Sequence, residues 1–133
     1  MAQISTSLNK QSQIAIVGLG YVGLPLAVEF SKKYLTIGLD KNNNRIDELK
    51  KGYDKTLEIK SSELKSLNNI RYTSVPKDAK NCNIYIITVP TPVNKKNEPN
   101  LLPLKEASKT VGRLINKNDI VIYESTVYPG ATE

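Results

Sequence analysis

Histidine is absent from the 133 residues of this chain, and cysteine occurs once, at Cys82. Histidine is the commonest general base and metal ligand near neutral pH. We therefore predict no metal site, and we expect any chemistry to use lysine, tyrosine, carboxylates, hydroxyls or a bound cofactor. A single cysteine cannot form an intramolecular disulfide, which excludes a disulfide-stapled scaffold.

Long apolar runs and blocks of like charge are also missing. No run approaches the roughly 20 residues of a membrane helix. The 19 Lys and Arg outnumber the 13 Asp and Glu, but they are scattered along the chain. This distribution leaves nucleotide or phosphate ligands open and predicts neither a nucleic-acid arm nor a membrane partner. Without an export signal, and with an unpaired thiol, the expected location is cytoplasmic.

The length suits one domain, since about 100 to 200 residues per domain is usual. Residues 1–13 are polar, and we interpret them as a flexible tail, with the domain proper at 14–133. The chain stops ten residues after its last predicted strand, at 120–123, so we expect it to be a fragment of a longer protein.

Short apolar segments alternate with amphipathic ones. Strands are predicted at 14–17, 35–39, 70–73, 84–89 and 120–123. Helices are predicted at 21–33, 45–51 and 61–67, and another begins near Pro103 with the apolar stripe Leu104, Ala107, Val111, Leu114 and Ile115. The alternation predicts an α/β fold: a Rossmann-type doubly wound parallel sheet of about five strands in three layers, with its second half truncated.

A glycine motif, GLGYVG, links the first predicted strand to the first predicted helix. In such a turn the first glycine permits the tight bend, the second lets a pyrophosphate approach the backbone, and the third lets the helix pack on the strand. Phosphates then meet free amides at the helix N-terminus. The motif predicts a dinucleotide site, although a tight turn without a ligand is the alternative. The predicted binding residues are Gly18, Gly20, Tyr21, Val22 and Gly23.

Asp40 ends the second predicted strand, 22 residues after Gly18. A carboxylate about 20 residues after the first glycine typically accepts hydrogen bonds from the adenosine ribose. Its charge would repel the additional phosphate of NADP, so NAD is the favoured cofactor. Lys41 and Arg45 are close enough in sequence to bind a phosphate, which argues the other way. The alternative interpretation is that both are solvated charges at a helix start.

Three motifs lie at the carboxyl ends of predicted strands, where ligands bind in open parallel sheets. They are IAIVGLGYVGLPLA at 14–27, VPTPV at 89–93 and ESTV at 124–127. Together they resemble the amino-terminal domain of the UDP-glucose/GDP-mannose dehydrogenase family, and the resemblance runs over 14–133. GYDKTLE at 52–58 and VYPGATE at 127–133 are most similar to the branch that oxidises UDP-N-acetyl-hexosamines for surface polysaccharides such as capsule and O-antigen.

The resemblance implies a reaction and a set of roles. Family members oxidise the C6 hydroxyl of a nucleotide sugar, here a UDP-sugar, to a carboxylate in two NAD-dependent steps through a cysteine thioester. The glycine loop would hold the pyrophosphate. Asp40 and Arg45 would bind the adenosine ribose. Ser125 and Thr126 would face the nicotinamide, with Thr126 as an auxiliary catalytic residue. The residues that would wall the cofactor are Val89, Pro90, Thr91 and Pro92.

The catalytic cysteine, lysine and glutamate of the family lie beyond Glu133, so we expect this chain to bind NAD without turning over substrate. Cys82 precedes the fourth predicted strand, at the edge opposite the cofactor, and is predicted to be an interior or edge residue. Tyr85 is predicted to be a packing residue. Full-length relatives commonly form homodimers through a later segment, so the fragment is expected to be monomeric.

Other classes fit less well. A short-chain dehydrogenase needs a tyrosine followed four residues later by lysine, and none of the seven tyrosines has one. The third glycine of the motif, Gly23, and the spacing to Asp40 fit a dinucleotide site better than they fit a methyltransferase. A non-catalytic NAD-binding regulatory module stays open as the alternative. Tyr53, Asp54 and Glu58 are either a substrate or subunit contact or an ordinary surface loop.

Overall fold

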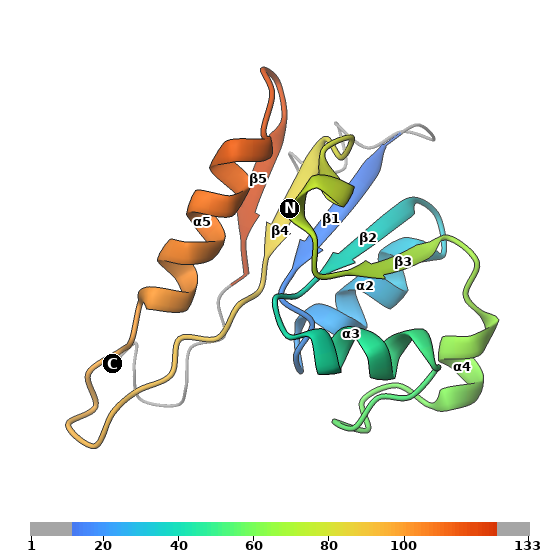
Figure 1. Cartoon of the computed structure of the whole chain (residues 1–133), viewed down its shortest axis with the longest axis horizontal. Coiled ribbons are helices and arrows are strands. Elements are labelled where there is room, and N and C mark those ends of the chain that lie inside the picture. Colours follow the sequence, from blue (N-terminus) through green and yellow to red (C-terminus); the bar gives the residue numbers. More distant parts are fainter. Residues whose placement is uncertain (1–11, 125–133) are drawn as a thin grey trace.

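The computed structural model describes residues 12–124, which form a five-stranded parallel sheet in the order β3-β2-β1-β4-β5 (Figure 1). The strands are β1 (Gln13–Val17), β2 (Leu35–Leu39), β3 (Ile70–Thr73), β4 (Ile84–Ile87) and β5 (Ile120–Tyr123). The described part of the chain starts in the middle of the sheet, winds to one edge, returns beside β1 and winds to the other edge. This is the arrangement of a doubly wound Rossmann sheet, so the predicted fold class is confirmed.

The register brings the ends of the strands to one level. Val17, at the end of β1, pairs with Leu39 of β2 on one side and with Ile87 of β4 on the other. Leu39 pairs in turn with Thr73, and Ile87 with Tyr123. The segments that follow β1, β2 and β4 therefore leave the same edge of the sheet, which we call the carboxyl edge.

The strand bounds differ from the predicted ones at two places. β4 ends at Ile87, so the last two residues of the predicted strand, 88–89, lie in the loop that follows. β1 begins at Gln13, which pairs with Leu35, so the strand includes the last residue of the predicted tail. The rest of that tail, residues 1–11, lies outside the described residues.

Helices and one 3-10 turn connect the strands: α2 (Gly23–Ser31), α3 (Asn43–Lys50), α4 (Ser61–Ser66), η1 (Pro76–Ala79) and α5 (Leu102–Leu114). α3 starts two residues earlier than predicted because the side chain of Asn42 caps it, accepting from the amides of Asn44 and Arg45. The 3-10 turn η1 is not predicted from the sequence. In the described part of the chain, no helix combines the length and apolar character needed to cross a membrane.

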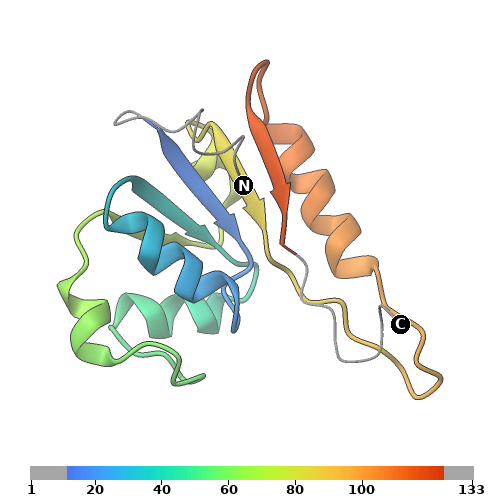
Figure 2. The same ribbon diagram turned by 180° about the vertical axis from the view of Figure 1, so that it is seen from behind.

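Two apolar clusters fill the spaces on either side of the sheet, because alternate side chains of each strand point to opposite faces. On one face, Ile14 and Ile16 pack with Leu24 and Val28 of α2. Figure 2 shows α2 lying over β1 and β2 on that face. On the other face lie Tyr85 and, from α5, two buried and two partly buried stripe residues: Ala107, Val111, Leu104 and Leu114. Helices cover both faces, as predicted. Ile115, the last residue of the predicted stripe, is 43% exposed, so the prediction is wrong for this residue.

Cys82 and Tyr85 belong to the second cluster. The Cys82 side chain is a free thiol and 3% exposed. Tyr85 is fully buried, and its hydroxyl donates to the carbonyl oxygen of Ala79 at 3.1 Å. Both predictions of an interior role are confirmed. Burial, with a smaller contribution from the charge of Asp119, raises the pKa of the Cys82 thiol to about 12.

Candidate cofactor-binding site

A cleft of about 490 Å³ opens at the carboxyl edge. Its walls come from the segments after β1, β2 and β4, from α5 and from the loop after α3. It contains most of the predicted binding residues: Gly18, Gly20, Tyr21, Asp40, Lys41, Arg45, Val89 and Pro90. Another hollow, of about 550 Å³, is lined by parts of α3, α4 and β3, but none of the predicted binding residues lines it. The chemistry of the lining therefore favours the cleft at the carboxyl edge.

A different structural feature explains glycine at each of the three glycine positions of the loop. Gly18 adopts φ +102°, a left-handed conformation that favours glycine. A Cβ atom on Gly23 would lie 1.7 Å from the carbonyl oxygen of Gly18, so a side chain there would push α2 away from the loop. A Cβ on Gly20 would meet nothing within 4 Å, because the space beside it belongs to the cleft. These findings agree with the turn, packing and approach roles expected of a dinucleotide loop.

The amides at the start of α2 are free to receive an anion. Leu24 donates to the carbonyl oxygen of Gly20 at 3.1 Å, and within residues 12–124 no acceptor takes the amide hydrogens of Gly20, Tyr21 or Val22. The N-cap residue, Val22, has no side-chain acceptor, and the first turn holds no acidic residue. Unpaired amides and the positive end of the helix dipole favour negative charge at this position.

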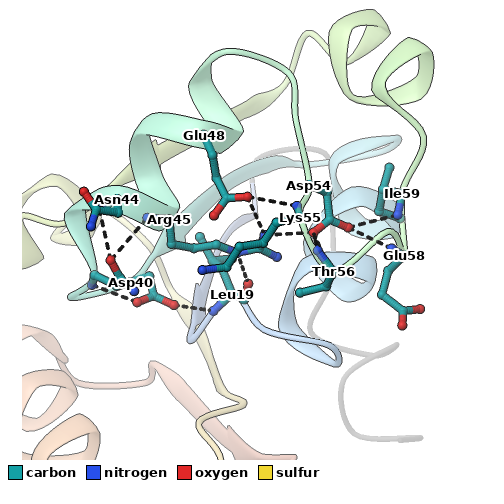
Figure 3. Close-up of polar contacts among 11 residues, drawn as sticks. Leu19, Asp40, Asn44, Arg45, Glu48, Asp54, Lys55, Thr56, Glu58 and Ile59 are labelled. Carbon is teal, nitrogen blue, oxygen red and sulfur yellow. Dashed lines mark hydrogen bonds and ion pairs between the residues drawn. The ribbon is translucent and has the colours of Figure 1, made fainter.

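Leu19, inside the glycine loop, is held through both of its backbone polar groups (Figure 3). Its amide donates to Oδ2 of Asp40 at 2.9 Å, and its carbonyl oxygen accepts from Nε of Arg45 at 2.7 Å. Its side chain is fully buried and packs where Gly38 leaves room, since a Cβ on Gly38 would lie 3.0 Å from both Leu19 methyl carbons. The residues after β2 thus fix the loop in place.

Asp40 is half-buried and lines the cleft. Its other oxygen, Oδ1, accepts from the amide of Asn42 at 2.9 Å. Each carboxylate oxygen can accept more than one hydrogen bond, so both can still accept from ligand hydroxyls. The arrangement leaves the predicted ribose acceptor in the cleft, beside the glycine loop.

Arg45 lines the cleft but is an interior residue, with a side chain only 5% exposed. Its Nη1 contacts Oδ1 of Asp54 at 2.8 Å and Oε2 of Glu48 at 3.3 Å. Its Nη2 is buried and has no partner among the described residues. The interpretation of Arg45 as a solvated charge is therefore wrong. Its contact with a cofactor ribose stays a prediction.

For Asp54, the partner of Arg45, the sequence allows either a substrate or subunit contact or a place in an ordinary surface loop. Asp54 is 1% exposed, and its carboxylate accepts from Arg45, from the amide and hydroxyl of Thr56, and from the amides of Glu58 and Ile59 (Figure 3). Burial raises the pKa of this carboxyl, but the hydrogen bonds from Thr56, Arg45 and the amides outweigh burial and lower it below its ordinary value. The surface-loop interpretation is wrong for Asp54.

Only some of the remaining predicted binding residues lie at the cleft. Lys41 is paired with Glu106 of α5 at 3.1 Å, and is exposed. Tyr21 is 68% exposed at the cleft, whereas Val22 is half-buried at the start of α2. Thr91 and Pro92 do not line the cleft. Ser125 and Thr126 lie outside the described residues, and the roles of all four stay predictions.

Some contributors to the site have only weak sequence signals. Thr88 follows β4 and donates through Oγ1 to the carbonyl oxygen of Gly18 at 2.6 Å, which ties the glycine loop to the neighbouring strand. Its position directly before the VPTPV motif could have identified it. Lys55, Thr56 and Glu106 also line the cleft. Within residues 12–124, no group of three or more acidic or cysteine side chains is arranged to hold a metal ion.

Comparison with known proteins identifies the family of this chain. The model of the UDP-glucose/GDP-mannose dehydrogenase family, NAD binding domain, matches residues 12–133. UDP-N-acetyl-D-glucosamine 6-dehydrogenase of Pseudomonas aeruginosa is 53% identical over 93% of this chain and 29% of its own length. Protein CapL of Staphylococcus aureus is 58% identical over 90% of this chain and 28% of its own length. The chain thus spans less than a third of these relatives.

Solved structures agree. UDP-D-ManNAc dehydrogenase of Pyrococcus horikoshii superimposes with a TM-score of 0.75 at 34% identity, over 90% of this chain and 30% of that one. GDP-mannose dehydrogenase of Pseudomonas aeruginosa gives a TM-score of 0.78 at 27% identity, over 90% of this chain and 29% of that one. The family match covers nearly the whole chain, and the glycine loop and Asp40 meet in one cleft. The chain belongs to the UDP-glucose/GDP-mannose dehydrogenase family and represents its NAD binding domain.

Proposed function

We propose that the cleft at the carboxyl edge binds NAD, and that the chain is the cofactor-binding part of a UDP-sugar 6-dehydrogenase. One observation carries this proposal. The open face of Gly20, the free amides of Gly20 and Tyr21, and the carboxylate of Asp40 share the same cleft, and Leu19 fixes their relative positions. An anion receptor beside a hydroxyl receptor matches the pyrophosphate and ribose of a dinucleotide.

Each proposed contact follows from a feature of the site. The amides of Gly20, Tyr21 and Val22 would hold the pyrophosphate, and the carboxylate of Asp40 would accept from the ribose hydroxyls. Val89 and the adjoining Pro90 would form an apolar wall. When bound, NAD supplies the hydride acceptor for oxidation of an alcohol.

The nicotinamide end is proposed from the family motif. Ser125 and Thr126 would face that ring, and the Thr126 hydroxyl, which can donate and accept, would orient the reacting group. Thr91 and Pro92 would extend the wall begun by Val89.

For the whole protein we propose the oxidation of a UDP-N-acetyl-hexosamine at its C6 hydroxyl to the uronic acid, in two NAD-dependent steps. Relatives named UDP-N-acetyl-D-glucosamine 6-dehydrogenase are 53% and 56% identical to this chain, whereas a UDP-N-acetyl-D-mannosamine dehydrogenase of Campylobacter jejuni is 36% identical. This difference favours the glucosamine substrate. The product would serve capsule or O-antigen synthesis. We further propose a cytoplasmic homodimer for the full-length enzyme and no turnover by this chain alone.

Titration calorimetry of the 133-residue chain with NAD and with NADP tests the cofactor proposal. We expect saturable binding of NAD and weaker binding of NADP. Absence of binding to NAD, or tighter binding of NADP, would overturn it. The substrate proposal is tested separately by offering the full-length protein UDP-N-acetyl-glucosamine with NAD. Binding of NAD without oxidation of any UDP-sugar would favour a regulatory module instead.

A further inference from the structure

Two cations follow Asp40 closely in the sequence and could receive the additional phosphate of NADP, but the structure pairs both with carboxylates. Arg45 contacts Asp54 at 2.8 Å and is 5% exposed. Lys41 contacts Glu106 of α5 at 3.1 Å. A phosphate on the ribose bound by Asp40 would therefore find both cations already neutralised.

The pair of Lys41 and Glu106 lies at the cleft itself. Lys41 directly follows the proposed ribose acceptor, Asp40, at the carboxyl end of β2, and Glu106 lies in the second turn of α5. Both residues line the cleft, and their side chains are 80% and 51% exposed. The contact thus joins two walls of the cleft at its solvent side.

We infer that Glu106 is a specificity-determining residue, which neutralises Lys41 and so disfavours NADP. This inference rests on the proposed binding of NAD in the cleft. A ribose 2′-phosphate carries close to two negative charges at neutral pH. To bind beside Asp40, it would have to draw Lys41 away from Glu106 and remain close to both carboxylates. NAD lacks the 2′-phosphate, so its binding neither requires the contact between Lys41 and Glu106 to break nor suffers repulsion from these carboxylates.

Lys55 is a third cation that lines the cleft, and its contribution to phosphate binding has to be distinguished from that of Lys41. The amide of Lys55 donates to Oε2 of Glu48 at 2.9 Å, which fixes its backbone, and its side chain makes no ion pair with the described residues. Lys55 is therefore a candidate for the cofactor phosphates in the wild-type chain and in every variant of Glu106. A gain in NADP binding that depends on Lys41 cannot come from Lys55.

The test is the ratio of NADP affinity to NAD affinity, measured by calorimetric titration at low salt. Glu106→Gln removes the charge and keeps the shape. We expect the ratio to rise about twofold to fivefold, a range suited to exposed charges, and to rise less in high salt. The double variant Glu106→Gln with Lys41→Gln should lose the gain. Glu98→Gln is the matched control, because Glu98 is exposed and does not line the cleft.

An unchanged ratio in Glu106→Gln, an equal rise in Glu98→Gln, or a gain that survives loss of Lys41 would overturn the inference. In each of these cases binding of NAD by the wild type would persist, so the proposed function would stand. If the wild-type chain does not bind NAD, the proposed function and this inference fall together.

Discussion

Nε of Arg45 donates to the carbonyl oxygen of Leu19 at 2.7 Å, across 26 positions of the chain. This contact joins the first buried side chain of α3 to the middle of the glycine loop. Because Asp54 holds Nη1 of the same guanidinium, the loop after α3 and the glycine loop are both bound to one buried arginine. The glycine loop of the proposed cofactor site and the loop after α3 thus depend on the same guanidinium.

Replacement of Asp54 by Asn should destabilise the fold strongly. It leaves the buried guanidinium of Arg45 with only its longer contact, to Glu48 at 3.3 Å, and removal of one partner from a buried pair typically costs about 3 to 5 kcal/mol. Urea unfolding at pH 7 would measure the loss. Asp47→Asn is the matched control, because Asp47 is exposed on the same helix. A similar small effect in both variants would show that the buried pair contributes little.

Acid should weaken the wild-type chain through the same group. The pKa of Asp54 is lowered in the folded state, so its stabilisation is present above the unfolded value, about 3.9, and is lost as the pH falls through the folded value. Asp54→Asn removes this component, so the free energy of unfolding of the variant should fall less steeply below pH 4. Unfolding curves at several acidic pH values would measure the difference. Parallel curves for the two proteins would exclude Asp54 as a source of acid sensitivity.

Three glycine-to-alanine variants compare the steric cost of adding a methyl group at different positions. Gly23→Ala should disrupt the loop and abolish NAD binding, because its Cβ would lie 1.7 Å from the carbonyl oxygen of Gly18. Gly20→Ala should keep the fold but weaken NAD binding, since its methyl group would enter the cleft where the pyrophosphate approaches. Gly112→Ala, exposed in α5 with nothing within 4 Å, should stabilise the chain by about 0.5 to 1 kcal/mol.

Thermal melting followed by NAD titration would distinguish the three glycine variants. The prediction fails if Gly23→Ala melts at the same temperature as the wild type, because the close approach of α2 to the loop would then be unnecessary.

The sequence predicts those parts of the site that depend on local spacing. The glycine loop and Asp40 could be placed because strand ends and turns follow from short apolar runs and glycines, and the parallel sheet aligns them. The bounds of β2, β3 and β5 were predicted correctly for the same reason.

Contacts made by side chains from separate loops could not be predicted. Arg45 reads as an exposed charge at a helix start, since no periodicity shows that the loop carrying Asp54 folds back over it. Lys41 and Glu106 are 65 positions apart, and only the packing of α5 against the sheet brings them together.

Cys82 should be unreactive in the folded chain. Its thiol is 3% exposed, and its pKa is raised to about 12, so almost no thiolate exists at neutral pH. Labelling with an aromatic disulfide reagent at pH 7 should be slow in the native chain and rapid in urea. Rapid labelling of the native chain would mean that the region around β4 opens easily.

Replacement of Asp40 by Asn should weaken NAD binding by about 1 to 3 kcal/mol, because hydrogen bonds from the ribose hydroxyls would lose their charged acceptor. The same change should raise the affinity for NADP relative to NAD, since it removes a negative charge beside the additional phosphate. Because Asp40 also accepts from the amide of Leu19 at 2.9 Å, the melting temperature must be recorded with each titration. Asp47→Asn is the control for loss of one negative charge. Unchanged NAD affinity in a fully folded Asp40→Asn chain would place the ribose elsewhere.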